Sequence, residues 1–166
     1  MWAELSEQNV IKASKQFWEQ MLSMKLDPIG NGEAVRLGDR HVLGVVALSG
    51  VWNGQIEVRL STRLAHEATA AMLMQPIEEV GDGDTLDATR EIANMIAGVL
   101  KSSLPRPCAM TIPRASIETA AYQQRDRDLL AVPFRHAAGE MLVRIWEVDC
   151  VAERSDSEML VQTESA

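Results

Sequence analysis

Residues 84–104 read DTLDATREIANMIAGVLKSSL, the strongest helical segment of the 166-residue chain. Its apolar residues recur at intervals of three and four, which is typical of one buried stripe on an amphipathic helix; they are Ile92, Ile96, Val99 and Leu100. Asp84 or Thr85 can cap the start of this helix, and Pro105 and Pro107 can end it. The stretch therefore predicts a long helix that lies against the rest of the fold along one face.

The opposite face of this predicted helix is polar, because Glu91, Asn94, Gly98 and Lys101 fall together there at about 100° per residue. Asn is a poor residue for a helix interior, since its side chain competes for backbone hydrogen bonds. A carboxylate and a carboxamide three residues apart have Cβ atoms roughly 5–6 Å from each other. The E-x-x-N pair is a candidate site. By itself the motif is weak, and it is also typical of a solvated face on which Glu91 pairs with Arg90 or a nearby base.

The chain begins with another predicted helix, over residues 5–26, which Ser6 can cap. Its apolar face consists of Val10, Phe17, Met21 and Met24. The Pro- and Gly-containing stretch 27–32 ends it, because no helix or strand continues through such a cluster. We expect Phe17 and Trp18 to be core or interface residues rather than ligand contacts.

Strands follow where the apolar period changes to two. Residues 33–37 alternate, and residues 41–51 are apolar on both faces, as expected of a strand inside a sheet. Asn53-Gly54 is a hairpin signal, since both residues tolerate positive φ. The return strand over residues 55–60 alternates, which predicts one buried and one wet face.

The remaining elements complete an alternation of helices and hairpins. A helix over residues 63–75 can be capped by Ser61 or Thr62, and an acidic linker joins it to the long helix. The last third predicts a hairpin loop at residues 136–139 and strands over residues 110–113, 116–122, 129–135 and 141–148. Pro133 suits an edge or a bulge. This order, without βαβ units, predicts an α+β fold with an antiparallel sheet packed against long helices.

Composition narrows the class of protein. The chain is 46% hydrophobic and 24% charged, as in ordinary globular proteins, and its length suits one domain. We expect that domain to span residues 1–150 and residues 151–166 to be a poorly ordered acidic tail. The net charge of −8 argues against binding to nucleic acid or anionic lipid.

Location and redox state follow from what the sequence does not contain. No signal peptide or membrane span is recognisable, so we expect a cytoplasmic protein that does not enter the membrane. Cys108 and Cys150 lack C-x-x-C spacing, which favours reduced thiols. The three histidines show no metal-ligand spacing, and we expect no metal site.

Two longer segments resemble a known family. Residues 44–74, GVVALSGVWNGQIEVRLSTRLAHEATAAMLM, and residues 90–104 are similar to the CheX branch of the CheC/CheX/FliY phosphatases, which act on the phosphorylated response regulator CheY. The shared features are Gly50, Gly54, Ser61, Ala65, the E-x-x-N-x-x-x-G pattern of Glu91, Asn94 and Gly98, and Ile112-Pro113. One E-x-x-N motif is present, where CheC-type members carry two, and Ala93 stands where several relatives have Gly.

The resemblance implies a mechanism that needs no cofactor of the protein's own. The partner would bring an aspartyl phosphate, Mg²⁺ and a lysine, so that what remains is to place a water in line with phosphorus. By resemblance Asn94 places this water, because an amide both donates and accepts hydrogen bonds. The resemblance also implies that Glu91 would pair with the partner's lysine, and that Asp87, Gly98 and Lys101 would touch the partner along the same stripe.

Two functions therefore stay open at the level of sequence. The first is a phosphatase for a phosphorylated CheY-like response regulator. The second is a non-catalytic module that docks a receiver domain or a flagellar switch component. The amide of Asn94 favours the first, since a docking face alone has no need of it. Family members of this branch form homodimers, and edge strands provide a means of such pairing.

Overall fold

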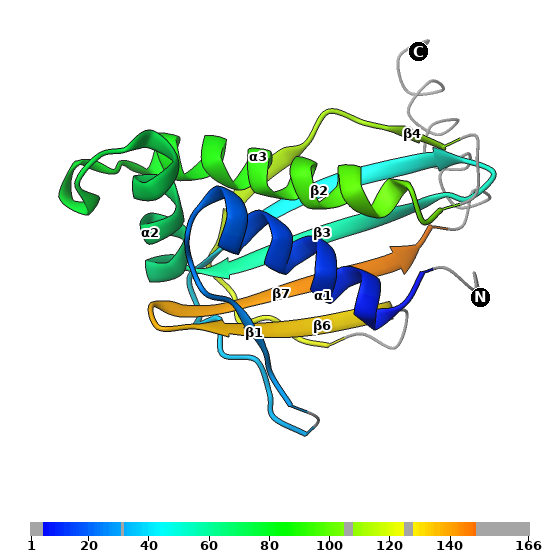
Figure 1. The fold of residues 1–166 in the computed structure, drawn as a ribbon, viewed down its shortest axis with the longest axis horizontal. Coiled ribbons are helices and arrows are strands. Elements are labelled where there is room, and N and C mark those ends of the chain that lie inside the picture. The colour runs from blue at the N-terminus through cyan, green and yellow to red at the C-terminus, as the bar shows by residue number, and fades with distance from the viewer. Residues whose placement is uncertain (1–4, 31, 105–107, 125–127, 149–166) are drawn as a thin grey trace, which may run out of the picture.

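The computed structural model describes residues 5–30, 32–104, 108–124 and 128–148, and places three α-helices on one face of an antiparallel sheet (Figure 1). The seven strands of these ranges are β1 Asp27–Pro28, β2 His41–Gly50, β3 Gly54–Ser61, β4 Cys108–Met110, β5 Arg114–Glu118, β6 Asp128–His136 and β7 Gly139–Glu147. Their order in the sheet is β1-β6-β7-β3-β2-β4, and β5 also pairs with β2. The predicted α+β class is confirmed.

The helices are α1 Glu7–Lys15, α2 Thr62–Leu73 and α3 Asp82–Lys101. α1 continues into the π-helix η1 Gln16–Met21, and a 3₁₀ turn, η2 Ile77–Glu79, joins α2 to α3. No helix among the described residues is both long and apolar enough to cross a membrane.

The core lies between the helices and the sheet. Strand residues that face the helices are almost fully buried, because period-two alternation turns every second side chain inward; they include Val46, Ile56, Val58, Leu60, Met141, Val143 and Ile145. α3 contributes Ile92, Ile96 and Leu100. Trp18 and Phe17 are buried in the same core, as the sequence predicts.

Hydrogen bonds at the helix starts are local. Ser6 precedes α1, and its hydroxyl accepts the N–H of Asn9 at 3.3 Å, so the predicted cap is confirmed. α3 starts two residues before the predicted position: the carboxylate of Asp84 accepts the N–H of Gly81 at 3.2 Å, and the hydroxyl of Thr85 donates to the carbonyl of Gly81 at 3.0 Å. Both predicted capping residues thus act from inside the helix.

Several sequence predictions are wrong in detail. Residues 33–37 form no strand but part of the connection to β2. The first helix ends at Met21 rather than residue 26, and Met21 is 64% exposed because the wider π turn changes which side chains face the core. Val99 is 43% exposed instead of buried. The predicted stops Pro105 and Pro107, Cys150 and the tail 151–166 lie outside the described residues.

The predicted hairpin between β2 and β3 is confirmed, but Gly54 is required for a different reason. The positive φ, 145°, occurs at Gly50. At Gly54, an added Cβ would lie 2.1 Å from the ring of Trp52 and 2.6 Å from the carbonyl oxygen of Trp146. Close packing of Trp52, and not backbone conformation, excludes a side chain there.

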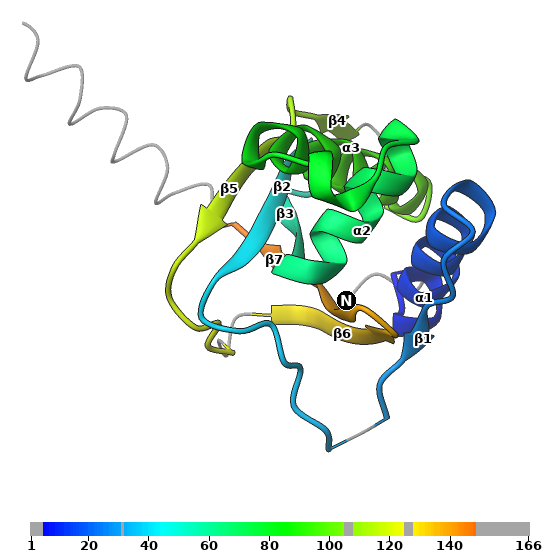
Figure 2. The ribbon, with the colours of Figure 1, turned by 90° about the vertical axis from the view of Figure 1, so that its left-hand side faces the viewer.

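The face of the sheet opposite the helices is less exposed to solvent than the alternating sequence of β3 predicts. Two connections run on that side, residues 32–40 and 119–124 (Figure 2). Arg144, 3% exposed, donates from Nη1 to Glu57 at 2.8 Å and from Nε to Asp128 at 2.9 Å. The ring of Tyr122 lies against the guanidinium groups of Arg144 and Arg59. A buried ionic cluster therefore replaces the expected solvated face.

Candidate functional site on α3

α3 lies directly on β2 because small residues meet at the contact. A Cβ atom at Gly44 would be 2.9 Å from the backbone oxygen of Thr89 and 3.2 Å from its Cγ2 atom. Gly44 pairs with Val58 of β3 on one side and Ala115 of β5 on the other. The middle of the helix is thus seated on the centre of a paired strand, which makes it a rigid support for the residues on its other side.

The opposite side of α3 faces away from the sheet and carries the predicted pair. Glu91 is exposed and Asn94 is half-buried. Within the described residues neither side chain has a hydrogen-bond or ion-pair partner. Both groups are consequently available to a second molecule.

Arg90 does not pair with Glu91. Its guanidinium instead forms an ion pair with Asp87, one turn earlier in α3. Of the purely structural alternatives for the motif, the local Arg90–Glu91 pair is therefore not observed. Asp87, which the sequence also assigned to the partner surface, already has a partner within the chain.

The other two predicted residues extend the stripe towards the end of the helix. At Gly98 an added Cβ would meet no atom within 4 Å, so no contact within the described chain requires a glycine there. Lys101 is half-buried. The structure thus brings Asp87, Glu91, Asn94, Gly98 and Lys101 to one side of one helix, as the spacing predicts.

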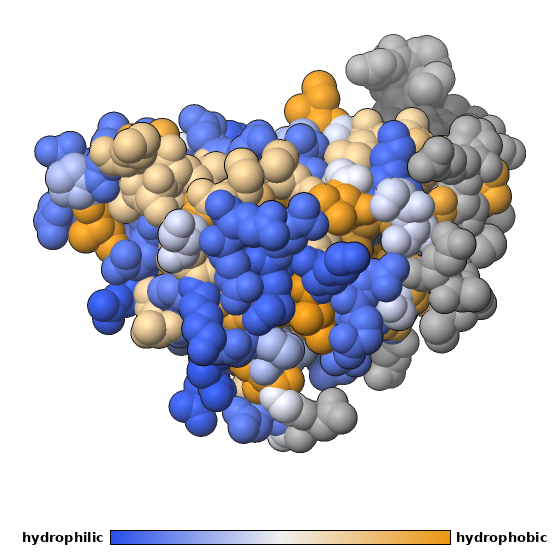
Figure 3. All heavy atoms as spheres, in the orientation of Figure 1, coloured by the Kyte–Doolittle hydropathy of each residue, from blue (hydrophilic) through white to orange (hydrophobic). Residues whose placement is uncertain are grey.

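Two apolar residues on the flank next to Glu91 were not assigned to the site by sequence. Met95 is half-buried and Val99 is 43% exposed. Figure 3 shows weakly hydrophobic residues mixed with hydrophilic ones over α3, whereas the surface over α1 is mostly hydrophilic. The signal that could have placed them is their spacing of four and eight residues after Glu91, which continues one ridge of the helix surface.

The chemistry available on this face is limited and specific. A carboxylate accepts charge-assisted hydrogen bonds, and a carboxamide donates and accepts at once. No group of three or more His, Cys, Asp and Glu side chains in the described ranges could hold a metal ion. Such an arrangement can accept hydrogen bonds from a second molecule and can orient a water.

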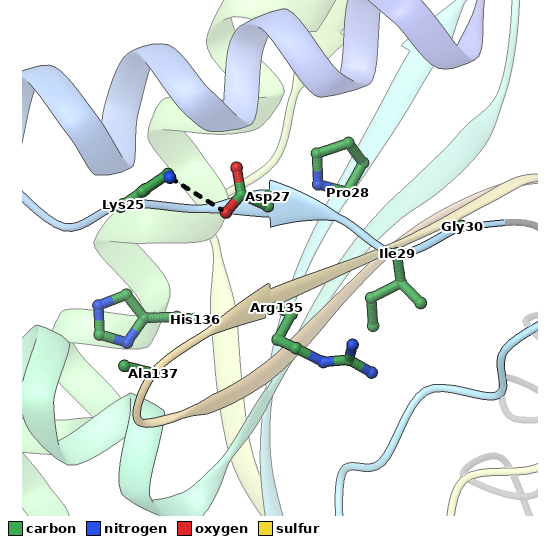
Figure 4. A pocket seen from close by; sticks show the side chains of 8 residues that line it. All are labelled: Lys25, Asp27, Pro28, Ile29, Gly30, Arg135, His136 and Ala137. Carbon is green, nitrogen blue, oxygen red and sulfur yellow. Dashed lines mark ion pairs between the residues drawn. The ribbon is translucent and has the colours of Figure 1, made fainter.

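A pocket of about 520 Å³ lies elsewhere, between β1 and the end of β6 (Figure 4). Lys25 and Asp27, 3.8 Å apart, line one side of it, and Arg135 and His136 line the other. None of the five predicted site residues contributes to it. The candidate site is an exposed helix face, as expected for a macromolecular partner rather than a small ligand.

Comparison with known proteins gives a family profile and a set of solved structures. The profile described as "Chemotaxis phosphatase CheX" matches residues 42–135. A chemotaxis protein CheX from Desulfovibrio desulfuricans is 23% identical, with a TM-score of 0.66 over 85% of this chain and 97% of that one. CheX from Vibrio vulnificus is 19% identical, with a TM-score of 0.68 over 87% and 97%.

A third similar structure is the CheX–CheY–BeF3–Mg²⁺ complex from Borrelia burgdorferi. Its matching chain is 17% identical, with a TM-score of 0.62 over 86% of this chain and 97% of that one. At these identities the likeness shows a shared fold. No curated protein matches the sequence.

Proposed function

This chain belongs to the CheX family of chemotaxis phosphatases, and from that premise we propose that it hydrolyses the aspartyl phosphate of a CheY-like response regulator. The observation that carries the proposal is the pair Glu91 and Asn94. The two residues lie on the exposed side of α3, three positions apart, and neither has a partner within the described residues.

Asn94 would orient the attacking water. Phosphoryl transfer depends chiefly on positioning and on electrostatic stabilisation of the transferred group. Because the carboxamide both accepts and donates, it holds a water in a defined direction without a change of its own protonation state. Asn94 is half-buried on a helix seated against β2, which limits the freedom of its side chain.

Glu91 would anchor the partner. An exposed carboxylate without an ion pair is available to the lysine of a receiver's phosphorylation site, with which it forms a charge-assisted contact. In this proposal the receiver supplies the Mg²⁺, in agreement with the Borrelia burgdorferi relative, whose structure contains CheY and Mg²⁺. Gly98 and Lys101 extend the contact along the same side of α3.

Self-association stays a prediction. β4 and β5 both pair with β2, and in the described ranges no strand covers their other edge. An uncovered strand edge can pair with a second copy of the chain. Gel filtration with light scattering would test it independently of the phosphatase activity.

The proposal is tested by following loss of phosphate from phosphorylated CheY-like receivers of the same organism. The wild-type protein should accelerate this loss. Asn94→Ala should abolish the acceleration and leave receiver binding largely intact. Because Ala is the better helix former, by up to about 0.7 kcal/mol, lost activity in this variant would not reflect unfolding.

Glu91→Ala should lower both the rate and the affinity, because it removes the anchoring charge. Glu78→Ala is the matched control: Glu78 is an exposed carboxylate on η2 and has no ion pair within the described residues. If wild type binds receivers without accelerating the loss of phosphate from any of them, the protein is a docking module and the enzyme proposal fails.

A further inference from the structure

Val99 is the residue of α3 whose position the fold does not explain. Its spacing from Ile92 and Ile96 predicts a core position, yet 43% of the residue is exposed. Isolated exposed apolar residues are common and need no explanation. Val99, however, continues the row of residues that starts at Glu91, and it lies about 80° around the helix from Glu91 and about 140° from Asn94, on the flank of the exposed side.

This side of the helix breaks local rules at several positions. Asn94, Gly98 and Val99 are all weaker helix formers than Ala, and no hydrogen bond or ion pair of the described chain involves the Asn94 side chain. Gly98 faces open space. Local departures without an internal gain are expected at functional sites, and Val99 lies on the flank where this exposed side meets the buried stripe.

Helix geometry puts these residues on two adjacent ridges. Glu91, Met95 and Val99 follow one another at intervals of four and form a single ridge. Asn94 and Gly98 lie on the neighbouring ridge. Because Gly98 has no side chain, the groove beside Val99 is open at that point. A partner that packs into this groove would touch Val99 and approach the helix backbone.

We infer that Met95 and Val99 form the apolar part of the surface that binds the phosphorylated receiver domain. The inference deepens the proposed function and rests on it. Glu91 and Asn94 would reach the phosphorylation site, while Met95 and Val99 pack against apolar side chains of the receiver beside that site. The partner surface thus has a polar turn followed by an apolar turn of α3.

The dimensions place this contact within reach of a folded partner. At 1.5 Å per residue, Val99 lies about 12 Å along the helix from Glu91. A domain of about 100 residues has a radius of gyration of about 13 Å, and a stable interface covers about 800 Å² on each partner. A receiver seated on Glu91 and Asn94 with an interface of that size can extend over the next two turns of α3 and reach Val99 on the flank next to Glu91.

Apolar contact beside the reacting groups affects affinity and not the chemical step. Val99 would be buried equally in the bound ground state and in the transition state. Its contact therefore stabilises both states by the same amount, which raises affinity without changing the rate of the chemical step. Asn94 differs, because its contact with the attacking water matters in the transition state. Variants of the two residues should therefore separate binding from rate.

The test measures both quantities on the full chain. Affinity is obtained by titrating the protein with a CheY-like receiver in Mg²⁺ and beryllofluoride, and rate from single-turnover loss of phosphate at saturating protein. Val99→Asp should weaken binding on the order of tenfold or more, and Val99→Ala about threefold. Both should leave the saturated rate within about twofold of wild type.

Val51→Asp is the matched control, since Val51 is also an exposed valine, at 57%, but lies between β2 and β3. It should leave affinity unchanged. Val99→Ala keeps the test decisive if the charged variant folds poorly, because Ala favours the helix. Unchanged affinity in the Val99 variants, or a loss of self-association instead of receiver binding, would overturn the inference. Absence of any binding or acceleration by wild type would overturn the proposed function itself.

Discussion

Gly44 of β2 and Ala93 of α3 are so close that a Cβ atom at position 44 would lie 2.9 Å from the Cβ atom of Ala93. The same atom would lie 2.9 Å from the backbone oxygen of Thr89, which cannot turn aside as the end of a side chain can. The contact fixes how closely the long helix approaches the sheet.

Gly44→Ala should destabilise the fold by about 1–3 kcal/mol, the usual effect of overpacking in a core. Denaturant unfolding followed by circular dichroism measures this change. Ala93→Gly in the same background should restore part of the loss, because one of the two close contacts disappears while that with Thr89 remains. A Gly44→Ala protein as stable as wild type would contradict the observed packing.

Gly98→Ala is the same substitution with the opposite expected result. The site is open, and Ala in a helix is favoured over Gly by roughly 0.5–1 kcal/mol, so the free energy of unfolding should rise by about that amount. Receiver affinity should fall, since a methyl group would hold the partner away from the helix. An unchanged affinity would remove Gly98 from the proposed partner surface.

The predictions from sequence succeed where local signals agree with the final packing. α3, the β2–β3 hairpin and the Ser6 cap are determined by periodicity and turn chemistry, and all three are present. The strand over residues 33–37 fails because alternation alone does not supply a neighbouring strand, and this segment has none. Glu91 and Asn94 are placed on an exposed face as predicted.

Tertiary contacts explain what sequence could not supply. The burial of Arg144 requires Asp128 and Glu57 from two other strands. No local sequence pattern predicts that arrangement. Val99 keeps a helical spacing from the core residues but lies about 80° around the helix from Glu91, at the edge of the buried stripe. Spacing alone does not say on which side of that edge a residue falls.

Asp128→Ala should be among the most destabilising single changes, because it leaves the buried guanidinium of Arg144 without its main partner. Removing one member of a buried ion pair typically costs about 3–5 kcal/mol. Lys25→Ala breaks the exposed ion pair between Lys25 and Asp27, whose charged atoms are 3.8 Å apart. This change should lower the free energy of unfolding by less than about 1 kcal/mol. Chemical denaturation of the two variants side by side checks the contrast, and equal losses would show that the Arg144 cluster is not stabilising.

The stability of the protein should also depend on pH through His41. Its Nε2 atom accepts from Arg59 at 2.8 Å, and its Nδ1 atom is 3.3 Å from the carbonyl oxygen of Gly38. Burial, and then the charge of Arg59, lower the pKa of His41 below its usual 6.5, while the carbonyl of Gly38 and the charge of Glu118 act in the opposite direction. The native imidazole is therefore neutral where an unfolded chain would already bind a proton.

Because the unfolded state binds more protons in that range, the free energy of unfolding should fall as pH drops below about 6.5 and continue to fall to the native pKa. Chemical denaturation between pH 7.5 and 5.5 measures the slope. His41→Gln should reduce this slope. Equal slopes in wild type and His41→Gln would exclude this histidine as the source.

Both residues of the proposed catalytic pair belong to α3, so helical geometry, and not the packing of distant segments, fixes their separation. If α3 shifts or tilts on the sheet as a unit, the carboxylate and the carboxamide move together and keep their mutual arrangement. The core beneath can therefore change in sequence without altering the separation of the two side chains. In engineering terms, the geometry of the proposed pair is portable: one turn of helix on another rigid support would keep the separation of the two side chains.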